Sequence, residues 1–76
     1  MFGTRAHLWQ VAQGTEEQWR WAVYRGSRQV FNSGESFTDR NYARLSAIKA
    51  MNSTPEKVQL KSCWIPAHRE CQVLVP

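Results

Sequence analysis

The sequence predicts an α+β domain, an antiparallel sheet of four or five strands with one helix packed on one face, in the order β-β-β-α-β-β. Three observations carry this prediction. Polarity alternates with period two in segments near both ends of the chain, the dipeptide Gly26-Ser27 suits a tight hairpin turn, and a single apolar helical stripe ends before a proline. With 76 residues the chain is near the lower limit for one hydrophobic core, so we expect a single domain over residues 1–76.

The first two strands are expected at residues 7–12 and 18–25, because both segments alternate in polarity and are rich in aromatic and branched residues. The five residues between them have a turn composition. Folding the first strand back over a five-residue loop sets its register. The resulting neighbours are Trp9 opposite Trp21 and Val11 opposite Trp19.

The third strand is expected at residues 28–33, joined to the second through Gly26-Ser27. A glycine at the first central position suits a two-residue type II′ turn, and this turn fixes the pairing of the two strands. The predicted pairs are Arg25 with Arg28, Tyr24 with Gln29, Val23 with Val30, Ala22 with Phe31, and Trp21 with Asn32.

This register assigns the side chains of the three strands to two faces. The predicted core face contains His7, Trp9, Val11, Trp19, Trp21, Val23 and Val30. The predicted outer face is mixed in polarity and contains Leu8, Gln10, Ala12, Arg20, Ala22, Tyr24, Gln29, Phe31 and Ser33. Such a face has enough apolar surface to favour contact with a partner, but it is too polar to form a second hydrophobic core.

A helix is expected at about residues 39–53, with Thr38 or Asp39 as its N-cap. Its apolar stripe is formed by Leu45, Ile48 and Met51, with Ala47 beside them, and should lie across the tryptophan face of the sheet. Thr54-Pro55 should end the helix, because proline cannot continue it.

Two further strands are expected at residues 57–65 and 71–75, joined by a turn at 66–69. In the longer of the two, Val58, Leu60 and Trp64 would share one face. The sequence leaves open whether this last part of the chain extends the sheet or covers its outer face.

Residues 19–48 resemble a known small family, the YegP-like domain. The resemblance is carried by Trp19-Arg20-Trp21-x-Val23, Gly26, Ser33-Gly34-Glu35-x-Phe37, Arg40 and Ala43. It implies a module of three strands followed by a helix, in agreement with the pattern of the residues themselves. That family has no well-established activity, so the resemblance supports the fold rather than a function.

The chain is basic, with ten Lys and Arg against six Asp and Glu, a net charge of +4 and a pI of about 9.6. This balance favours an anionic partner. No acid occurs between Gln18 and Gly34, where arginines accompany outward aromatic side chains that could stack on bases. The candidate binding residues are Arg20, Tyr24, Arg25, Arg28 and Phe31, with Arg40 and Arg44 extending the charge along the helix.

These residues predict a small non-enzymatic binding module that contacts nucleic acid or a nucleoprotein complex. A second hypothesis is a phage- or mobile-element-encoded inhibitor of a host protein complex, of the anti-CRISPR or another anti-defence type, acting by protein–protein binding. A homodimer is a third. An enzyme is not expected, because no nucleophile, base and orienting group occur with recognisable spacing and no glycine-rich phosphate loop precedes the helix.

The cysteines leave alternatives open. If the last hairpin turns about Ala67, Cys63 and Cys71 face each other at a separation close to that of a disulfide. With His68 and the distant His7 they would supply four soft ligands for zinc. Two unmodified thiols are favoured in a reducing cytoplasm, so no metal and no cofactor is the leading expectation.

We expect a cytoplasmic protein without a membrane partner. No stretch approaches the roughly 20 apolar residues that span a bilayer, and the N-terminus lacks the apolar run of a secretory signal.

Overall fold

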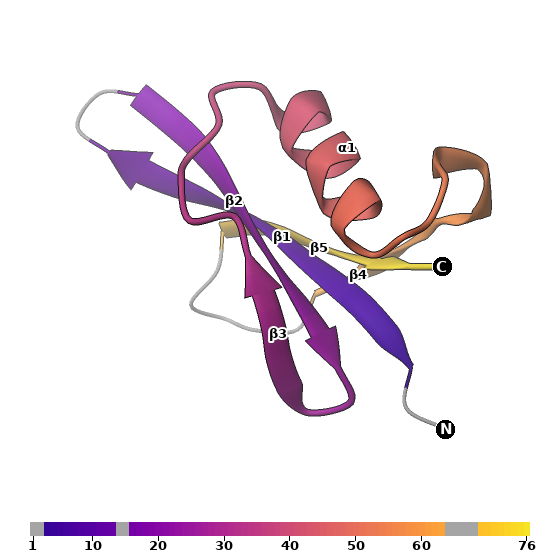
Figure 1. Ribbon diagram of the computed structural model, residues 1–76. Coiled ribbons are helices and arrows are strands. Elements are labelled where there is room, and N and C mark those ends of the chain that lie inside the picture. Colours follow the sequence, from indigo (N-terminus) through magenta and orange to yellow (C-terminus); the bar gives the residue numbers. More distant parts are fainter. Residues whose placement is uncertain (1–2, 14–15, 64–68) are drawn as a thin grey trace.

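The computed structural model describes residues 3–13, 16–63 and 69–76, and it has the predicted order of strands and helix (Figure 1). A short 3₁₀ helix, η1, is added between the helix and the fourth strand. The elements are β1 (Thr4–Gln13), β2 (Glu16–Arg25), β3 (Arg28–Asn32), α1 (Arg40–Ala50), η1 (Pro55–Lys57), β4 (Gln59–Ser62) and β5 (Arg69–Val75).

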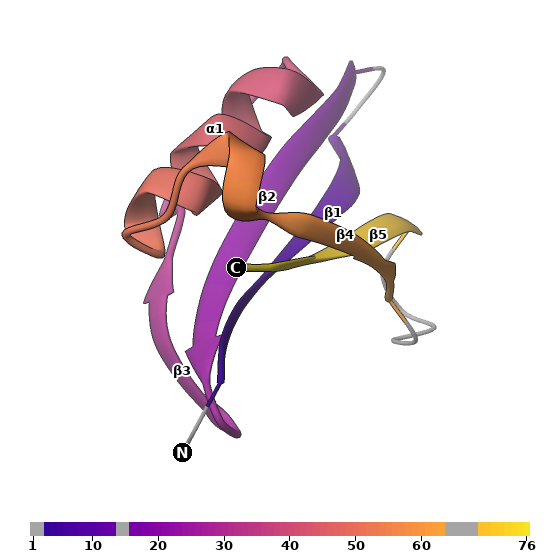
Figure 2. The same cartoon turned by 90° about the vertical axis from the view of Figure 1, so that its right-hand side faces the viewer.

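The strands form one antiparallel five-stranded sheet in the order β3-β2-β1-β5-β4, with α1 packed on one face over β2 and β1. β5 pairs with β1, and β4 forms the outer edge on that side, away from β3 (Figure 2). The last part of the chain therefore extends the sheet, which answers the question that the sequence left open.

The hydrophobic core lies between α1 and the sheet. Trp19 and Trp21 are buried there, as expected, and the helix covers the face that carries them. Burying apolar surface stabilises the fold by about 25 cal/mol per Å², and each indole contributes a large area. The other core members are Ala6, Leu8, Val23, Ala43, Ala47, Ile48, Met51 and Leu74.

The predicted register of β1 against β2 is wrong by one residue. Leu8, not Trp9, pairs with Trp21, and Gln10 pairs with Trp19. The ladder continues as far as the pair of Gln13 with Glu16, so two residues separate the strands instead of five. Because side chains alternate along a strand, this shift exchanges the two faces of β1. Leu8 is consequently in the core, and His7, Trp9 and Val11 belong to the face opposite α1.

The register of β2 against β3 is confirmed at the turn and wrong beyond it. Gly26 has a φ of 63° at the first central position, and Arg25 with Arg28 and Tyr24 with Gln29 are paired as predicted. The register then shifts, so that Val30 is an extra residue, a β-bulge. The observed pairs beyond it are Val23 with Phe31 and Ala22 with Asn32.

The bulge moves Phe31 to the other face. Phe31 pairs with Val23, whose side chain is in the core, so Phe31 lies on the α1 side of the sheet and is 57% exposed. The predicted neighbourhood of Tyr24 and Phe31 on one outer face is therefore wrong. Val30, predicted in the core, is 38% exposed.

The helix begins as predicted and ends earlier. The Asp39 side chain accepts a hydrogen bond of 2.9 Å from the backbone N–H of Asn41. Asn52, with a φ of 58°, ends the helix before Pro55 is reached, because a left-handed residue reverses the chain. Ala43 and Ala47 face the sheet, where their small side chains let α1 approach the indoles. Leu45, predicted in the stripe, is 49% exposed, because the 3.6-residue turn carries it away from that side.

Replacing the N-cap tests the start of α1. Asp39→Ala is expected to lower the free energy of unfolding by about 1 kcal/mol, because the N–H of Asn41 loses its acceptor. Asp39→Asn keeps an acceptor at this position and should cost much less. Urea unfolding followed by circular dichroism measures both variants, and an equal loss in the two would contradict the capping role.

The last hairpin is shorter at β4 and longer at β5 than predicted. Leu60 pairs with Leu74 on the core side but is 53% exposed, since β4 is an edge strand. Val58 packs against the core from the end of η1. Trp64, which was expected to share their face, lies outside the described residues. In the described part of the chain, neither helical segment has the length and apolar character of a bilayer-spanning helix.

Candidate functional site

The sheet face opposite α1 carries the candidate site. We call the part of this face between the Arg5 and Trp9 positions of β1 the open face. Cross-strand pairing places its residues together, in three rows that run across β1, β2 and β3. They are Arg5, Tyr24 and Gln29 in the first row, His7, Ala22 and Asn32 in the second, and Trp9 and Arg20 in the third. These eight residues include no acid, and Glu16 lies on the same face of β2 two rows beyond Arg20.

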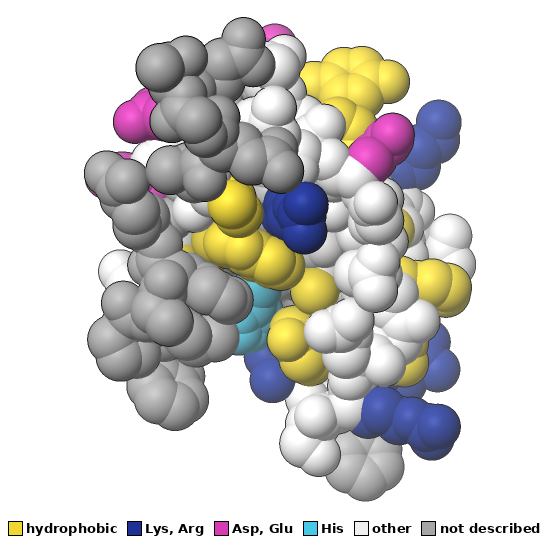
Figure 3. Space-filling view, turned by 90° about the vertical axis from the view of Figure 1, so that its left-hand side faces the viewer, with side chains coloured by type: hydrophobic (Ala, Val, Ile, Leu, Met, Phe, Trp, Pro, Cys, Tyr) yellow, Lys and Arg dark blue, Asp and Glu magenta, His cyan; other side chains and the backbone are white. Residues whose placement is uncertain are grey.

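Figure 3 shows this side of the molecule, where hydrophobic side chains and a histidine lie together and Lys or Arg side chains lie beside and below them. Trp9 and Tyr24 are half-buried, and Arg20 is exposed. Half-buried rings keep a fixed orientation while one part of their surface stays accessible to a ligand.

Arg5, His7 and Tyr24 form a connected cluster at one end of the open face. The Arg5 guanidinium carbon lies 5.2 Å from the Tyr24 ring centroid, and the His7 and Tyr24 centroids are 4.9 Å apart. Arg5 Nε donates to His7 Nε2 at 3.2 Å, and Arg5 also donates to the Gly26 carbonyl. A guanidinium has donors only, so His7 Nε2 accepts this bond with its lone pair. Both acceptors are neutral, so Arg5 pairs with no acid among the described residues.

A hollow of about 280 Å³ extends from the Trp9 end of the open face along β3 as far as Gln29. Trp9 and Arg20 are cross-strand partners at its rim, and the amides of Gln29 and Asn32 also line it. Arg20 Nε donates to Ser36 Oγ at 2.9 Å, which orients the guanidinium through another neutral partner. Amides supply both donors and acceptors, so the hollow combines an aromatic ring, a cation and hydrogen-bonding groups. Its size suits one heterocyclic ring system.

The structure divides the predicted binding residues among different surfaces. Arg20 and Tyr24 belong to the open face, as predicted. Arg25 and Arg28 are exposed and paired at the tip of the β2–β3 hairpin, where with Ser27 they line a separate hollow of about 410 Å³. Phe31 lies on the α1 side.

The helix arginines do not extend the open face, because α1 lies on the opposite side of the sheet. The Arg40 guanidinium carbon lies 5.9 Å from the Trp19 ring centroid, in cation–π contact. Arg44 is half-buried beside Ile48 and Pro55, and its Nε has no hydrogen-bond partner among the described residues. The prediction that these two residues continue the same charged surface is wrong.

Sequence reasoning missed Arg5, His7 and Trp9 as members of the open face. The register error in β1 hid His7 and Trp9, and Arg5 was missed because β1 begins at Thr4, three residues earlier than predicted. A signal was present, since Gly14-Thr15 repeats the glycine-first pattern of Gly26-Ser27 that favours two-residue hairpin loops. A two-residue loop there predicts the observed pairing.

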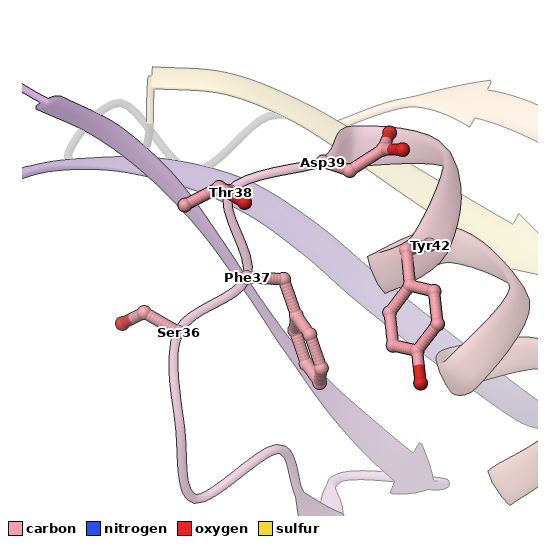
Figure 4. Close-up of a pocket in the computed structure, with 5 residues that line it drawn as sticks. All are labelled: Ser36, Phe37, Thr38, Asp39 and Tyr42. Atoms are coloured by element: carbon pink, nitrogen blue, oxygen red, sulfur yellow. The ribbon is translucent and has the colours of Figure 1, made fainter.

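A second aromatic surface lies on the α1 side. Phe37 and Tyr42, whose ring centroids are 5.5 Å apart, line a hollow of about 380 Å³ with Ser36, Thr38 and Asp39 (Figure 4). Tyr42 is 64% exposed. Of the described residues that line this hollow, none is an arginine or a lysine, and the charged one is the acid that caps α1. The open face is therefore the better match to an anionic ligand.

The cysteines lie beside the open face. Cys63 and Cys71 are opposite each other, as the hairpin geometry predicted, and they form a disulfide with their Cα atoms 5.2 Å apart. The expectation of two unmodified thiols is wrong for this structure, because the β4–β5 register brings the two positions within bonding reach. A ring nitrogen of the buried His7 and the two sulfurs all lie within 4.8 Å of one another. His68, the remaining residue of the predicted zinc set, lies outside the described residues.

Comparison with known proteins adds no assignment to this geometry. No protein-family model, curated protein or solved structure matches this chain, so the resemblance to the YegP-like domain stays a prediction.

Proposed function

We propose that this protein binds single-stranded nucleic acid, alone or within a nucleoprotein complex, through its open face. The observation that carries the proposal is the placement of two half-buried rings, Trp9 and Tyr24, in the same three rows of the sheet as Arg5 and Arg20, with no acid in these rows. Proteins that bind single strands combine stacking platforms with cations that follow the backbone, and this face has both components.

The Trp9 end of the open face suits an unpaired base. An aromatic ring stacks on any base, with a contribution of about 1–3 kcal/mol per base. In the hollow beside Trp9, the amides of Gln29 and Asn32 can reach the donors and acceptors of a base edge. A base within a duplex is stacked on both sides, so this mode of binding favours single strands.

The arginines suit the phosphates. Within the described part of the chain Arg5 and Arg20 bond neutral acceptors, so neither charge is paired with an acid there. The row of Arg5 and the row of Trp9 are four residues apart along β1, which is about 13 Å and a span that a few nucleotides cover. Arg25 and Arg28 at the hairpin tip would attract the strand as it leaves the open face.

Fluorescence anisotropy with labelled single-stranded and double-stranded DNA and RNA tests the proposal. We expect single strands to bind more tightly at low salt, with affinity falling steeply as the salt concentration rises. Tyr24→Ala should weaken binding by about 1–3 kcal/mol, since a stacking surface is lost. Arg20→Gln should reduce the slope of log affinity against log salt by about 0.7, since one phosphate contact is lost.

Matched controls come from the α1 side of the same chain. Tyr42→Ala removes a more exposed tyrosine, and Arg40→Gln removes an arginine of the helix, so neither should change the affinity appreciably. Thermal melts confirm that each variant is folded. The proposal fails if no single strand binds at low salt, or if Tyr42→Ala weakens binding as much as Tyr24→Ala.

The inhibitor hypothesis makes a different prediction for the same protein. A protein partner that stays bound in stoichiometric amount after nuclease treatment, together with no affinity for oligonucleotides, would replace the nucleic-acid proposal.

A further inference from the structure

Three soft side chains from different parts of the chain converge beside the open face. His7 comes from the central strand β1, Cys71 from β5, and Cys63 directly follows β4. His7 is buried, the cysteines are half-buried, and one ligand atom from each lies within 4.8 Å of the other two. The proposed contacts with nucleic acid do not involve the His7 ring, and His7 is not a member of the hydrophobic core cluster.

The backbone already holds these residues at spacings that suit a metal. Zinc binds thiolate sulfur at about 2.3 Å and imidazole nitrogen at about 2.0–2.1 Å, so in a tetrahedral site the two sulfurs lie about 3.8 Å apart. The Cα atoms of Cys63 and Cys71 are 5.2 Å apart on paired strands, and rotation about χ1 adjusts the distance between the sulfurs without moving the strands. Two thiolates with one imidazole form a ligand set that zinc prefers.

We propose that His7, Cys63 and Cys71 bind zinc when the disulfide is reduced. The end of β4 is thus linked to β5 either by the disulfide or by the metal. A dithiol reductant supplies two electrons and two protons, the Cys63–Cys71 bond breaks, and the reductant becomes its own disulfide. A zinc ion then displaces the two thiol protons to solvent and forms two bonds to sulfur and one to an imidazole nitrogen. Solvent takes the fourth position.

The compartment decides which form is present. A reducing cytoplasm, the location expected from the sequence, opens disulfides of ordinary stability, whereas an oxidising compartment keeps them closed. In a reducing compartment, where the disulfide does not persist, zinc would link β4 to β5 in its place.

Arg5 opposes the metal in two ways. It donates to His7 Nε2, so it occupies a lone pair of the ligand, and its positive charge lies close to the incoming cation. A neutral imidazole has a single lone pair, so a metal at Nε2 displaces Arg5, and a metal at Nδ1 moves the ring proton to Nε2, which also breaks the hydrogen bond from Arg5. Arg5→Met is therefore expected to tighten metal binding, an effect that a mere structural role of Arg5 would not produce.

Cobalt(II) is the probe, because tetrahedral cobalt with thiolate ligands is coloured and zinc is not. The protein is reduced with a dithiol, desalted without oxygen and titrated with cobalt(II). We expect thiolate-to-metal charge-transfer bands and tetrahedral d–d bands that saturate at one equivalent and disappear when zinc is added. Without reduction, the bands should not form.

Variants assign the ligands. Cys71→Ser and His7→Gln should each lower the cobalt affinity about a hundredfold or more, because even loss of an outer partner of a ligand costs 10–100-fold. Glu70→Gln, which changes an exposed acid next to Cys71, should leave the affinity unchanged. Circular dichroism before titration shows that each variant is folded, and Cys63→Ser repeats the test at a different position.

The proposal is overturned if the reduced protein develops no cobalt bands, or if His7→Gln binds cobalt with the same spectrum and affinity. Neither result depends on oligonucleotide binding, so failure of this inference and failure of the nucleic-acid proposal are separate outcomes.

Discussion

Replacing Leu8 with alanine is expected to lower the free energy of unfolding by about 2–5 kcal/mol. Leu8 is completely buried between the sheet and α1 and is among the largest fully buried side chains. Its truncation removes apolar contact and leaves a cavity, because the close-packed core around it relaxes only partially. A domain of this size has only about 5–15 kcal/mol of stability, so a large part of it would be lost.

Leu45→Ala is the matched control, because it deletes the same atoms from a residue that is 49% exposed. We expect a change below about 1 kcal/mol, since half of the side chain is already in water and alanine is the better helix former. Urea unfolding of both variants, compared at equal m-value, measures the difference. A larger loss for Leu45→Ala than for Leu8→Ala would contradict the observed register of β1 and the observed rotation of α1.

Removal of the disulfide is expected to have the next largest effect. The double variant Cys63→Ser/Cys71→Ser should lose about 2.5 kcal/mol of unfolding free energy, because the link restricts the unfolded chain across a sequence separation of 8 residues. β4 is an exposed edge strand that pairs only with β5 in the described sheet, so the loss should be greatest there. Hydrogen exchange should show faster exchange of the β4 amides than of those in β1 and β2.

The control is the wild-type chain treated with a dithiol in the presence of a chelator. It should lose the same free energy as the double variant, while the double variant should not respond to the dithiol. If the double variant unfolds at the same urea concentration as the untreated wild type, the disulfide does not contribute to stability as stated. Zinc is withheld here, because the metal is proposed to restore the link.

Local signals determined much of the fold. Glycine at the first central position of the β2–β3 turn, an aspartate at the N-cap of α1 and alternating polarity in the strands each act within a few residues. Each of these predictions is confirmed by Gly26, Asp39 and the order of elements. The opposition of Cys63 and Cys71 also followed from local hairpin geometry.

The candidate site was predicted less well, because its composition depends on pairing between strands. An error of one residue in the β1–β2 register hid His7 and Trp9, and the late predicted start of β1 hid Arg5. A bulge at Val30 carried Phe31 to the far side. Tyr24 and Arg20 were placed correctly, since both lie on β2, whose faces were set by its own alternation.

The sequence by itself therefore determined the kinds and the order of the elements, the hairpin turn at Gly26, the cap at Asp39 and the burial of Trp19 and Trp21. Only the tertiary structure decided the register of β1, the bulge at Val30, the side of α1 that meets the sheet and the meeting of His7 with the cysteines. The physical reason is the range of the interactions. Turns and caps are stabilised by contacts within a few residues, whereas register and helix rotation are selected by which arrangement buries the most apolar surface across the whole domain.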